Sequence, residues 1–500
     1  MRRTLLLLAL AADAGADDAA VSRAQAIGKA GPEAARERIP ELIAIGKGGA
    51  RERFAARDAL AIAGPHAVAP LLEGASGDAD LRLLLEGVSY DLGAAVVAPA
   101  LPALASENAA TRAMAAAALG AAGKGGEAAV KRLIEALYDD DAAVRREAAT
   151  ALGRIGRGAH DAIPGLILLA NDRERGCTRE AILALGMILR DAAERARPAP
   201  KVSPEVSSAI QKGLAWLARQ QTPEGWWAIP AAGDVAAPEK ARACVASLAL
   251  LAMLDGGADP RAPELRAGLR FVVAADASPG DYPQSWCDVD VVATTLCAAA
   301  RVLGEPECTA VAKRLVAADV ATGAEPGAWR ALAVLEADFA GLSHPPSGHT
   351  GDVVPWVQVL VRLAAGEDPT SKEVRGEVES CPKDLQRFPD GKLRWPEDPG
   401  LVARARWYGG VKSDTLVESV LKEQREDGSW KSEPLDPVPS TACMLLALEA
   451  AAGLAHPLTM PLPDAPQLKA AVATLQLAAQ SKDPEIRAAA QQALAGFAAR

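Results

Sequence analysis

The sequence predicts an all-α protein built from helix pairs. Half of the 500 residues are hydrophobic, yet only 18 are aromatic (5 Phe, 9 Trp and 4 Tyr), so alanine and leucine supply most of the apolar surface. These two residues favour close-packed helices over strands. Two patterns support this fold class: a repeat in the first 200 residues, and alternating helical stretches punctuated by glycine and proline from 204 to about 455.

The N-terminus predicts an export signal. Arg2 and Arg3 form a short basic region, residues 4–12 are apolar, and Ala14-Gly15-Ala16 fits a small-residue cleavage site. We expect residues 1–16 to be removed from an exported protein of the periplasm or cell envelope. The alternative is an alanine-rich start of a cytosolic protein. The other apolar runs are too short to span a bilayer, so the sequence predicts no transmembrane segment.

Residues 25–195 carry a repeat of helix pairs. Leu-Gly pairs fall at 119, 152 and 185, a period of 33. In several copies an Asp or Asn precedes an Arg by four residues, where it can cap a helix while the Arg pairs with it or with its neighbour. The pattern resembles HEAT repeats, whose helix pairs bury their apolar faces only against the next pair. The acid-to-Arg copies are Asp78 and Arg82, Asn108 and Arg112, and Asp141 and Arg145.

A proline-rich break at 196–204 separates this array from a second region, 203–455. Apolar periodicity between glycine and proline junctions predicts a run of helices there. The most apolar ones, at 241–254, 291–303 and 441–452, are expected to be the most buried. The predicted helices are 204–220, 238–255, 262–275, 287–304, 306–320, 327–341, 352–366, 370–380, 399–409, 412–424 and 439–452.

Two seven-residue motifs in this region read Q-x-x-x-G-x-W, and each follows an amphipathic helical stretch. The glycine can take a turn conformation that a Cβ would oppose, and the glutamine amide can bond backbone groups left open at a helix end. The tryptophan then covers the turn with a large apolar face. We interpret these residues as structural: Gln221, Gly225 and Trp227 in the first motif, and Gln424, Gly428 and Trp430 in the second.

The twin motif resembles the QW repeat of the terpenoid cyclase and protein prenyltransferase superfamily, and squalene–hopene cyclases in particular. The resemblance implies that 203–455 folds as an α/α toroid of helix pairs, following the HEAT-repeat α-solenoid. It also implies a central cavity, with the more apolar helices forming the inner ring. In that superfamily the QW repeat is a structural device, so it says little about chemistry.

The resemblance suggests one candidate catalytic pair, Asp288 and Asp290. Squalene–hopene cyclases place an acidic D-x-D-D motif at a similar station, and its middle Asp protonates an alkene. Asp288 matches the first Asp and Asp290 the middle one, but Val291 replaces the last. Alkene protonation needs a carboxylic acid tuned by its neighbours, and this cluster is incomplete. The structural interpretation is that Asp288 caps a helix and Asp290 lies in its first turn.

No cofactor and no metal are predicted. In the prenyltransferase branch, Asp, Cys and His bind zinc, but the spacing of Cys287, Asp288, His344 and His349 does not match. Phosphate-binding loops, nucleophile elbows and H-E-x-x-H motifs are absent from the sequence. Seven cysteines are scattered without a C-x-x-C, and whether Cys297 and Cys308 form a disulfide stays open.

The tail, 465–500, returns to the first pattern, with Asp483 and Arg487 at the acid-to-Arg spacing. It predicts a HEAT-like helix pair that docks on the toroid or on the N-terminal array, because one pair cannot bury its own apolar face. The net charge of −10 carries no basic block, which argues against nucleic acid as a partner.

Two functions are consistent with these patterns. The first is an exported, non-catalytic scaffold that binds a protein or peptide on its HEAT surface, with room for an apolar small molecule in the toroid cavity. The second is an isoprenoid cyclase or prenyltransferase-like enzyme acting through Asp290. A deep aromatic-lined apolar cavity ending at Asp290 would favour the enzyme, whereas a shallow or polar interior would favour the scaffold.

Overall fold

The computed structural model confirms the all-α prediction. It describes residues 18–494 apart from 76, 198, 228–238, 278–288, 319–327, 341, 343–354, 366, 384–398, 431–436, 456 and 458–461. Within these residues every regular element is a helix, and the extended pairing described is an isolated bridge between Gln221 and Trp227. The chain divides into two compact units: residues 1–196, 304–307 and 461–500 form the first, and 197–303 and 308–460 the second.

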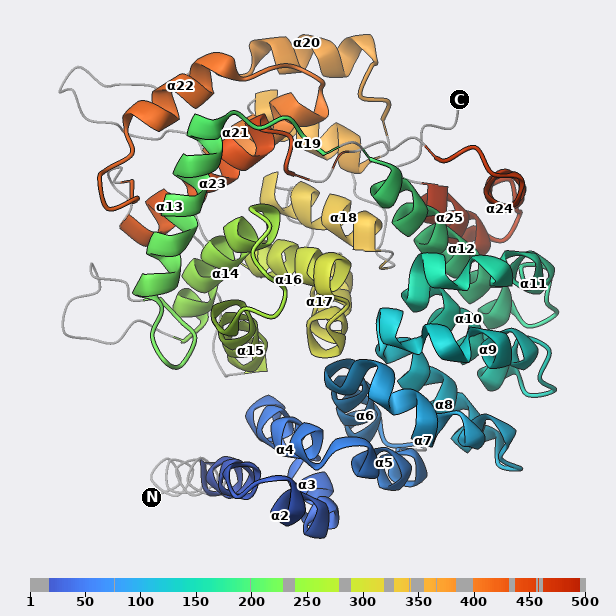
Figure 1. Cartoon of the computed structure of the whole chain (residues 1–500). Helices are drawn as coiled ribbons and strands as arrows, with labels where there is room; N and C mark the ends of the chain where they lie inside the picture. Colours follow the sequence, from blue (N-terminus) through green and yellow to red (C-terminus); the bar gives the residue numbers. More distant parts are fainter. Residues whose placement is uncertain are drawn as a thin grey trace, which may run out of the picture. The chain divides into compact units, whose positions relative to one another are not determined.

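The first unit is an array of stacked helix pairs, coloured blue through cyan to teal green, and dark red, in Figure 1. A helix over 18–29 precedes the labelled ones. Short 3-10 turns lie between many of the pairs. The labelled helices are α2 (Pro32–Glu37), α3 (Ile39–Ile45), α4 (Ala50–Ala63), α5 (Val68–Gly74), α6 (Ala79–Leu92), α7 (Val97–Ala100), α8 (Ala109–Ala121), α9 (Val130–Ala136), α10 (Ala142–Ile155), α11 (Ile163–Leu169), α12 (Arg175–Ala196), α24 (Pro466–Ala478) and α25 (Pro484–Leu494).

One helix of each pair lies in a continuous inner row, formed by α4, α6, α8, α10, α12 and α25 in that order. Neighbours in this row pack closely, most of all α8 with α10 and α10 with α12, whereas their partners α9 and α11 make far less contact with each other. The array therefore curves with the inner row on its concave side, as expected for a solenoid of helix pairs.

The repeated Leu-Gly pairs mark where these helices touch. A methyl group on Gly120 would lie 2.6 Å from the Cα of Ala151, and one on Gly153 would lie 2.9 Å from the Cα of Ala184. Such distances are too short for real carbon atoms, so only glycine permits this helix separation. The period of 33 in the sequence thus records the spacing of close helix contacts.

The Asp and Asn residues of the repeat cap helices, but the arginines do not pair with them. Asp141 Oδ1 accepts hydrogen bonds from Ala143 N (2.8 Å) and Val144 N (3.3 Å) at the start of α10. Arg145 instead pairs with Asp172 in the following repeat, with 2.9 Å between Nε and Oδ2. Arg145 thus makes no ion pair with Asp141 itself, whose carboxylate accepts from backbone N–H groups, but its Nη1 donates to the carbonyl of the neighbouring Asp140 at 3.0 Å. Arg112 repeats this pattern with Asp139.

The second unit is a ring of helices, green to orange in Figure 1. Contacts run from α14 to α16, α18, α19, α21 and α23, and the ring closes where α23 packs on α14. Every predicted helix of this region is a helix, with ends within three residues of those expected. The helices are α13 (Pro204–Gln220), α14 (Glu239–Asp255), α15 (Pro263–Ala277), α16 (Val289–Leu303), α17 (Pro306–Ala318), α18 (Ala328–Ala340), α19 (Pro355–Ala364), α20 (Lys372–Ser380), α21 (Pro399–Tyr408), α22 (Asp414–Lys422) and α23 (Pro437–Ala451).

The innermost helices are buried on all sides. Residues 243–255 of α14 and 438–450 of α23 are buried without a break, and residues 291–299 of α16 likewise. A helix that is apolar all round is buried in this way. By contrast α13, α15, α20 and α22 each pack on the ring with only one face.

One stretch among the described residues, Ala79–Ala100, is long and apolar enough to cross a membrane by length and composition alone. It comprises α6, a 3-10 turn over Gly93–Val96, and α7. Its first part packs between α4 and α8 in the array, and a core helix of a folded protein passes the same test. This is weak evidence for a membrane span.

Candidate functional site

The structure describes one member of the predicted catalytic pair. Asp290 lies in the first turn of α16, and its Oδ1 is 3.7 Å from Nη1 of Arg330 in α18. Thr294 Oγ1 donates a hydrogen bond to the Asp290 carbonyl oxygen at 2.7 Å. Asp288 lies outside the described residues, as do Cys287, His344 and His349.

The six described cysteines, including Cys297 and Cys308, are buried, and no disulfide joins any two of them. The disulfide that the sequence left open between Cys297 and Cys308 is therefore not formed in this structure. Burial raises the pKa of Cys297 well above that of an ordinary thiol. The neutral thiol form then packs as a small apolar side chain.

The first Q-x-x-x-G-x-W motif ties the end of α13 to the start of α15. Gln221 Nε2 donates hydrogen bonds to the carbonyls of Gly225 (3.0 Å) and Glu264 (2.9 Å). Gly225 has φ +94°, and a Cβ there would lie 2.3 Å from the Ala267 carbonyl oxygen. The accepting carbonyls thus belong to the turn and to the first turn of α15, whereas the sequence predicted bonds to backbone groups left open at a helix end.

The second motif repeats this geometry on the neighbouring pair of helices. Gln424 Nε2 donates to the carbonyls of Gly428 (3.1 Å) and Ala209 (2.8 Å), and Gly428 has φ +96°. Both tryptophans are fully buried, and each indole N–H donates to a carbonyl ten residues earlier. Those bonds are 2.8 Å long, from Trp227 to Leu217 and from Trp430 to Val420.

Buried charges gather in the ring, on helices that the sequence does not connect. Arg404 of α21 pairs with Asp255 of α14 and, at 3.2 Å, with Glu336 of α18. Arg301 of α16 contacts the same two acids: its Nε lies 3.0 Å from Glu336 Oε2, and its Nη2 lies 3.7 Å from Asp255 Oδ1. We call these four residues the ring charge cluster. Positive and negative groups alternate around it, so each charge is compensated by two opposite ones.

The ring charge cluster crosses the interior of the ring. Helices α14 and α21 are not neighbours, because α23 lies between them in the ring. The ion pair between Asp255 and Arg404 therefore spans the inner side. Both side chains are almost completely buried, at 2% and 1% exposed. At this level the ring is filled by charged groups, and an apolar ligand would have to displace them.

Glu449 of α23 adds a fifth ionisable group. It is completely buried, and neither carboxyl oxygen has a hydrogen-bond partner among the described residues. Burial raises the pKa of Glu449 well above its ordinary value, and the charge of Arg404 only partly opposes this. A neutral carboxylic acid is the form that such an environment favours.

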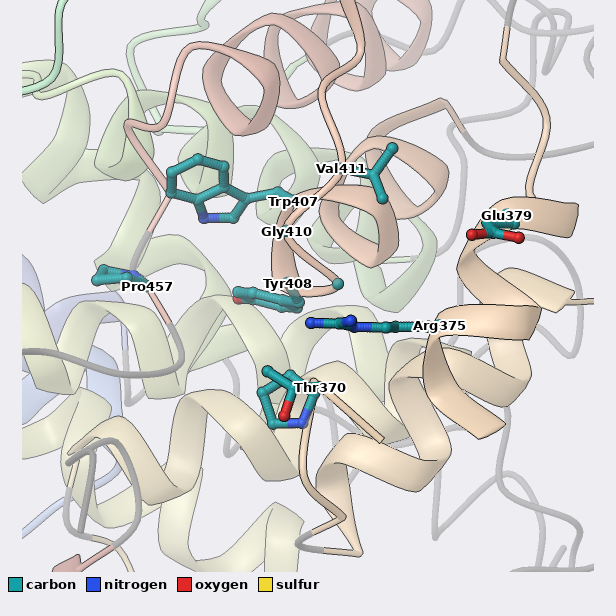
Figure 2. Close-up of a pocket in the computed structure, with 10 residues that line it drawn as sticks. Thr370, Arg375, Glu379, Trp407, Tyr408, Gly410, Val411 and Pro457 are labelled. Carbon is teal, nitrogen blue, oxygen red and sulfur yellow. The ribbon is translucent and has the colours of Figure 1, made fainter. Parts of the chain in front are cut away.

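A pocket of about 570 Å³ opens beside the last turn of α21, and Asp290 is not among the residues that line it (Figure 2). Burial raises the pKa of its Tyr408 phenol to about 12, so the hydroxyl stays protonated at neutral pH. The pocket is lined by Pro369, Thr370, Arg375, Glu379, Trp407, Tyr408, Gly409, Gly410, Val411 and Pro457.

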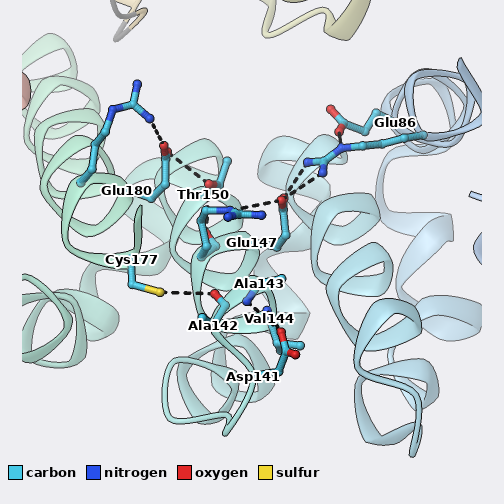
Figure 3. A network of polar contacts seen from close by, with 12 residues as sticks. Glu86, Asp141, Ala142, Ala143, Val144, Glu147, Thr150, Cys177 and Glu180 are labelled. Carbon is cyan, nitrogen blue, oxygen red and sulfur yellow. Dashed lines mark hydrogen bonds and ion pairs between the residues drawn. The ribbon is translucent and has the colours of Figure 1, made fainter. Parts of the chain in front are cut away.

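In the array, ion pairs bridge two repeats across the helix between them (Figure 3). Arg82 of α6 contacts Glu147 of α10 with Nη2 to Oε2 at 2.7 Å, and Arg154 of α10 contacts Glu86 of α6 at 2.8 Å. Helix α8 lies between α6 and α10, and residues 113–121 of α8 are buried all round. The small side chains of this alanine-rich helix leave room for the charged bridge above it.

The acids of this bridge lie beneath the arginines. Side chains of Glu86 and Glu147 are each 7% exposed, whereas Arg82 is 35% and Arg154 is 24% exposed. Burial alone would raise the pKa of Glu86, but the charges of Arg154 and Arg82 outweigh it and hold that pKa below its ordinary value. On this surface of the array the guanidinium groups are therefore more exposed than the carboxylates.

Comparison with known proteins identifies HEAT repeats. The family model described as HEAT repeats matches residues 97–186, from α7 into α12. HEAT repeats suggest a helical scaffold or protein-binding role. One solved structure, of an engineered protein from the Northeast Structural Genomics Consortium, is 18% identical and covers 95% of this chain and 98% of its own. Its TM-score of 0.25 is too low to support a common fold. The curated proteins contain no match.

Proposed function

We propose that this chain is a non-catalytic scaffold that binds a protein or peptide on the concave face of its HEAT array. The observation that carries the proposal is the continuous inner row, which is held rigid by the bridge over α8. A rigid concave surface preserves its binding geometry without an ordering cost on association. The exposed side chains there include Arg146 and Arg179, 47% and 34% exposed, so a partner segment with acidic groups suits it best.

Two features of the ring favour a scaffold over a cyclase. The ring charge cluster occupies the interior at the level of Arg404 and Asp255, where an isoprenoid would need apolar walls. Near Asp290, Nη1 of the Arg330 guanidinium lies 3.7 Å from the carboxyl Oδ1, so this group is engaged in an ion pair within the ring. Both observations support a structural role for the ring and not a catalytic one.

Site-specific photo-crosslinking tests the binding proposal. A photoreactive amino acid replaces Arg146 or Arg179 on the inner row. In the control it replaces Tyr138, which is 60% exposed in the turn that follows α9. In the native host we expect a discrete cross-linked partner from positions 146 and 179 and none from 138. Equal cross-linking at all three positions, or at none, would remove the support for a concave binding face.

We further propose that the protein is exported and that the mature chain begins at Asp17. The basic, apolar and small-residue segments at its N-terminus support this. Mass spectrometry of the protein from its native host should find a semi-tryptic peptide that starts at Asp17. Peptides covering residues 4–16 in the abundant form would contradict export by this route.

The cyclase alternative has its own test. Incubation with squalene and shorter polyprenyl substrates should give no cyclised product. If the unmodified protein forms a product that Asp290→Asn abolishes, the scaffold proposal is wrong and the cyclase hypothesis replaces it. If the product survives that substitution, the active site lies elsewhere in the chain.

A further inference from the structure

The pocket beside α21 has one apolar end and one charged end. Figure 2 shows Trp407 and Pro457 at one end, Arg375 and Glu379 toward the other, and Tyr408 between them. Its volume of about 570 Å³ lies in the range of small-molecule sites. An occupant should therefore carry an apolar body and a charged head.

The two charges at the polar end differ from their neighbours, which are paired. Arg362 of α19 binds Glu377 at 3.0 Å and Glu367 at 3.1 Å. Within the described part of the chain, Arg375 and Glu379 make no ion pair, either with each other or with another side chain. They lie one turn apart on α20, a spacing at which opposite charges can meet. One cation and one anion are thus left available on the same pocket wall.

The apolar end of the pocket is formed by the Trp407 indole and Pro457. The indole of Trp407 lies against Gly453, where an added Cβ would come within 2.9 Å of the ring. Trp407 and Tyr408 both line the pocket, so an aromatic ligand group can pack against their rings.

We propose that this pocket binds an aromatic or large apolar α-amino acid in its zwitterionic form. The carboxylate pairs with Arg375, the ammonium pairs with Glu379, and the side chain packs between Trp407 and Tyr408. The apolar contacts supply most of the affinity, since ion pairs at exposed groups contribute modestly. This site is independent of the concave face of the array.

Three related probes separate the two charge contacts. Phenylalanine carries both charges, N-acetylphenylalanine only the carboxylate, and phenylalanine amide only the ammonium. Calorimetric or NMR titration of the full chain should give Kd values on the order of 1 mM for phenylalanine. Each singly charged probe should bind about fivefold more weakly than phenylalanine.

Variants of the polar end should show a crossed pattern. Arg375→Gln should weaken phenylalanine and N-acetylphenylalanine about fivefold and leave phenylalanine amide unchanged. Glu379→Gln should weaken phenylalanine and phenylalanine amide and leave N-acetylphenylalanine unchanged. Lys372→Gln, on the same helix but outside the pocket lining, is the matched control and should change none of them.

Two results would count against the amino-acid site. Absence of phenylalanine binding at 10 mM, about tenfold above the expected Kd, overturns the proposal. Uniform weakening of all three probes by both variants overturns the charge assignment. All three substituted positions are exposed, so a loss of folding is not expected; unchanged circular dichroism would verify this. The cross-linking result on the array neither supports nor contradicts the pocket.

Discussion

Gly186 of α12 packs directly against Ala493 of α25, although the whole ring separates them in the sequence. A methyl group on Gly186 would lie 2.9 Å from the Ala493 Cα and 2.8 Å from its Cβ. Gly120 with Ala151, and Gly153 with Ala184, make the same contact earlier in the array. The helix pair α24 and α25 therefore continues the array as its next repeat, and the ring is an insertion between two consecutive repeats.

Gly186→Ala should loosen this last repeat. The new methyl group meets backbone atoms that cannot rotate away, so overpacking should cost about 1–3 kcal/mol. Hydrogen exchange across residues 466–494 should accelerate. Gly176→Ala is the matched control on the same helix, because nothing lies closer than 3.8 Å to its added Cβ. Gly176 lies in the first turn of α12, so the control should change stability by less than about 0.5 kcal/mol. Equal effects of the two substitutions would refute the close contact.

Trp430→Ala should destabilise the ring by about 3–5 kcal/mol, because the side chain is completely buried. Trp430→Phe keeps most of the packing and removes the indole bond to Val420, so it should cost less. Urea denaturation followed by circular dichroism measures both. An unchanged midpoint for Trp430→Ala would mean that this motif does not hold the ring together.

Glu449→Gln should stabilise the protein at alkaline pH. The pKa of Glu449 is raised in the folded state, whereas an unfolded Glu titrates near 4.3. Unfolding therefore releases a proton above that pH, and the stability associated with the protonated acid is lost as pH rises. Glutamine resembles the protonated form at every pH. The difference in Tm between variant and wild type should grow from pH 5 to pH 9, and a constant difference would contradict a buried neutral acid.

Glu86→Gln should have the opposite pH dependence. The pKa of Glu86 is held low in the folded state, so its contribution is present above the ordinary carboxyl pKa and lost as pH falls. At pH 7 the variant should lose about 1–3 kcal/mol, since Arg154 and Arg82 lose a buried acceptor. The loss should shrink toward pH 3. Glu135→Gln, whose carboxylate is 50% exposed, is the control and should change stability by less than about 0.5 kcal/mol.

The helices could be predicted because their signals are local. Glycine and proline fix the ends of helices such as 204–220, and apolar periodicity fixes their faces. The contact between Gly186 and Ala493 could not be predicted in the same way. The Leu-Gly pair at 185 and 186 lies at the repeat period and therefore predicts which face of α12 packs on another helix. It does not predict which helix packs there. The tail carried an acid-to-Arg pattern, and this left both the ring and the array open as docking partners.

The ring charge cluster could not be predicted because its members are single charges on separate helices. Asp255 ends an apolar helix, and Glu449 lies within another. An isolated charge in an apolar run needs a partner, so the sequence predicts that these residues are paired or neutral. Sequence spacing cannot say which partner, since Arg404 reaches Asp255 only once the ring has closed. The arginines of the array show the same limit, because Arg145 pairs with Asp172 in the next repeat.

The insertion of the ring between two repeats also orders events during synthesis. The face of α12 around Gly186 is complete long before residues 484–494 leave the ribosome, because the 287 residues from 197 to 483 must be translated first, which takes roughly 14–57 s at about 5–20 residues per second. Throughout that interval the nascent array ends in an uncovered apolar helix. A nascent-chain chaperone that shields such a face, or rapid folding of the ring as it is made, would decide how much of the newly made protein escapes aggregation.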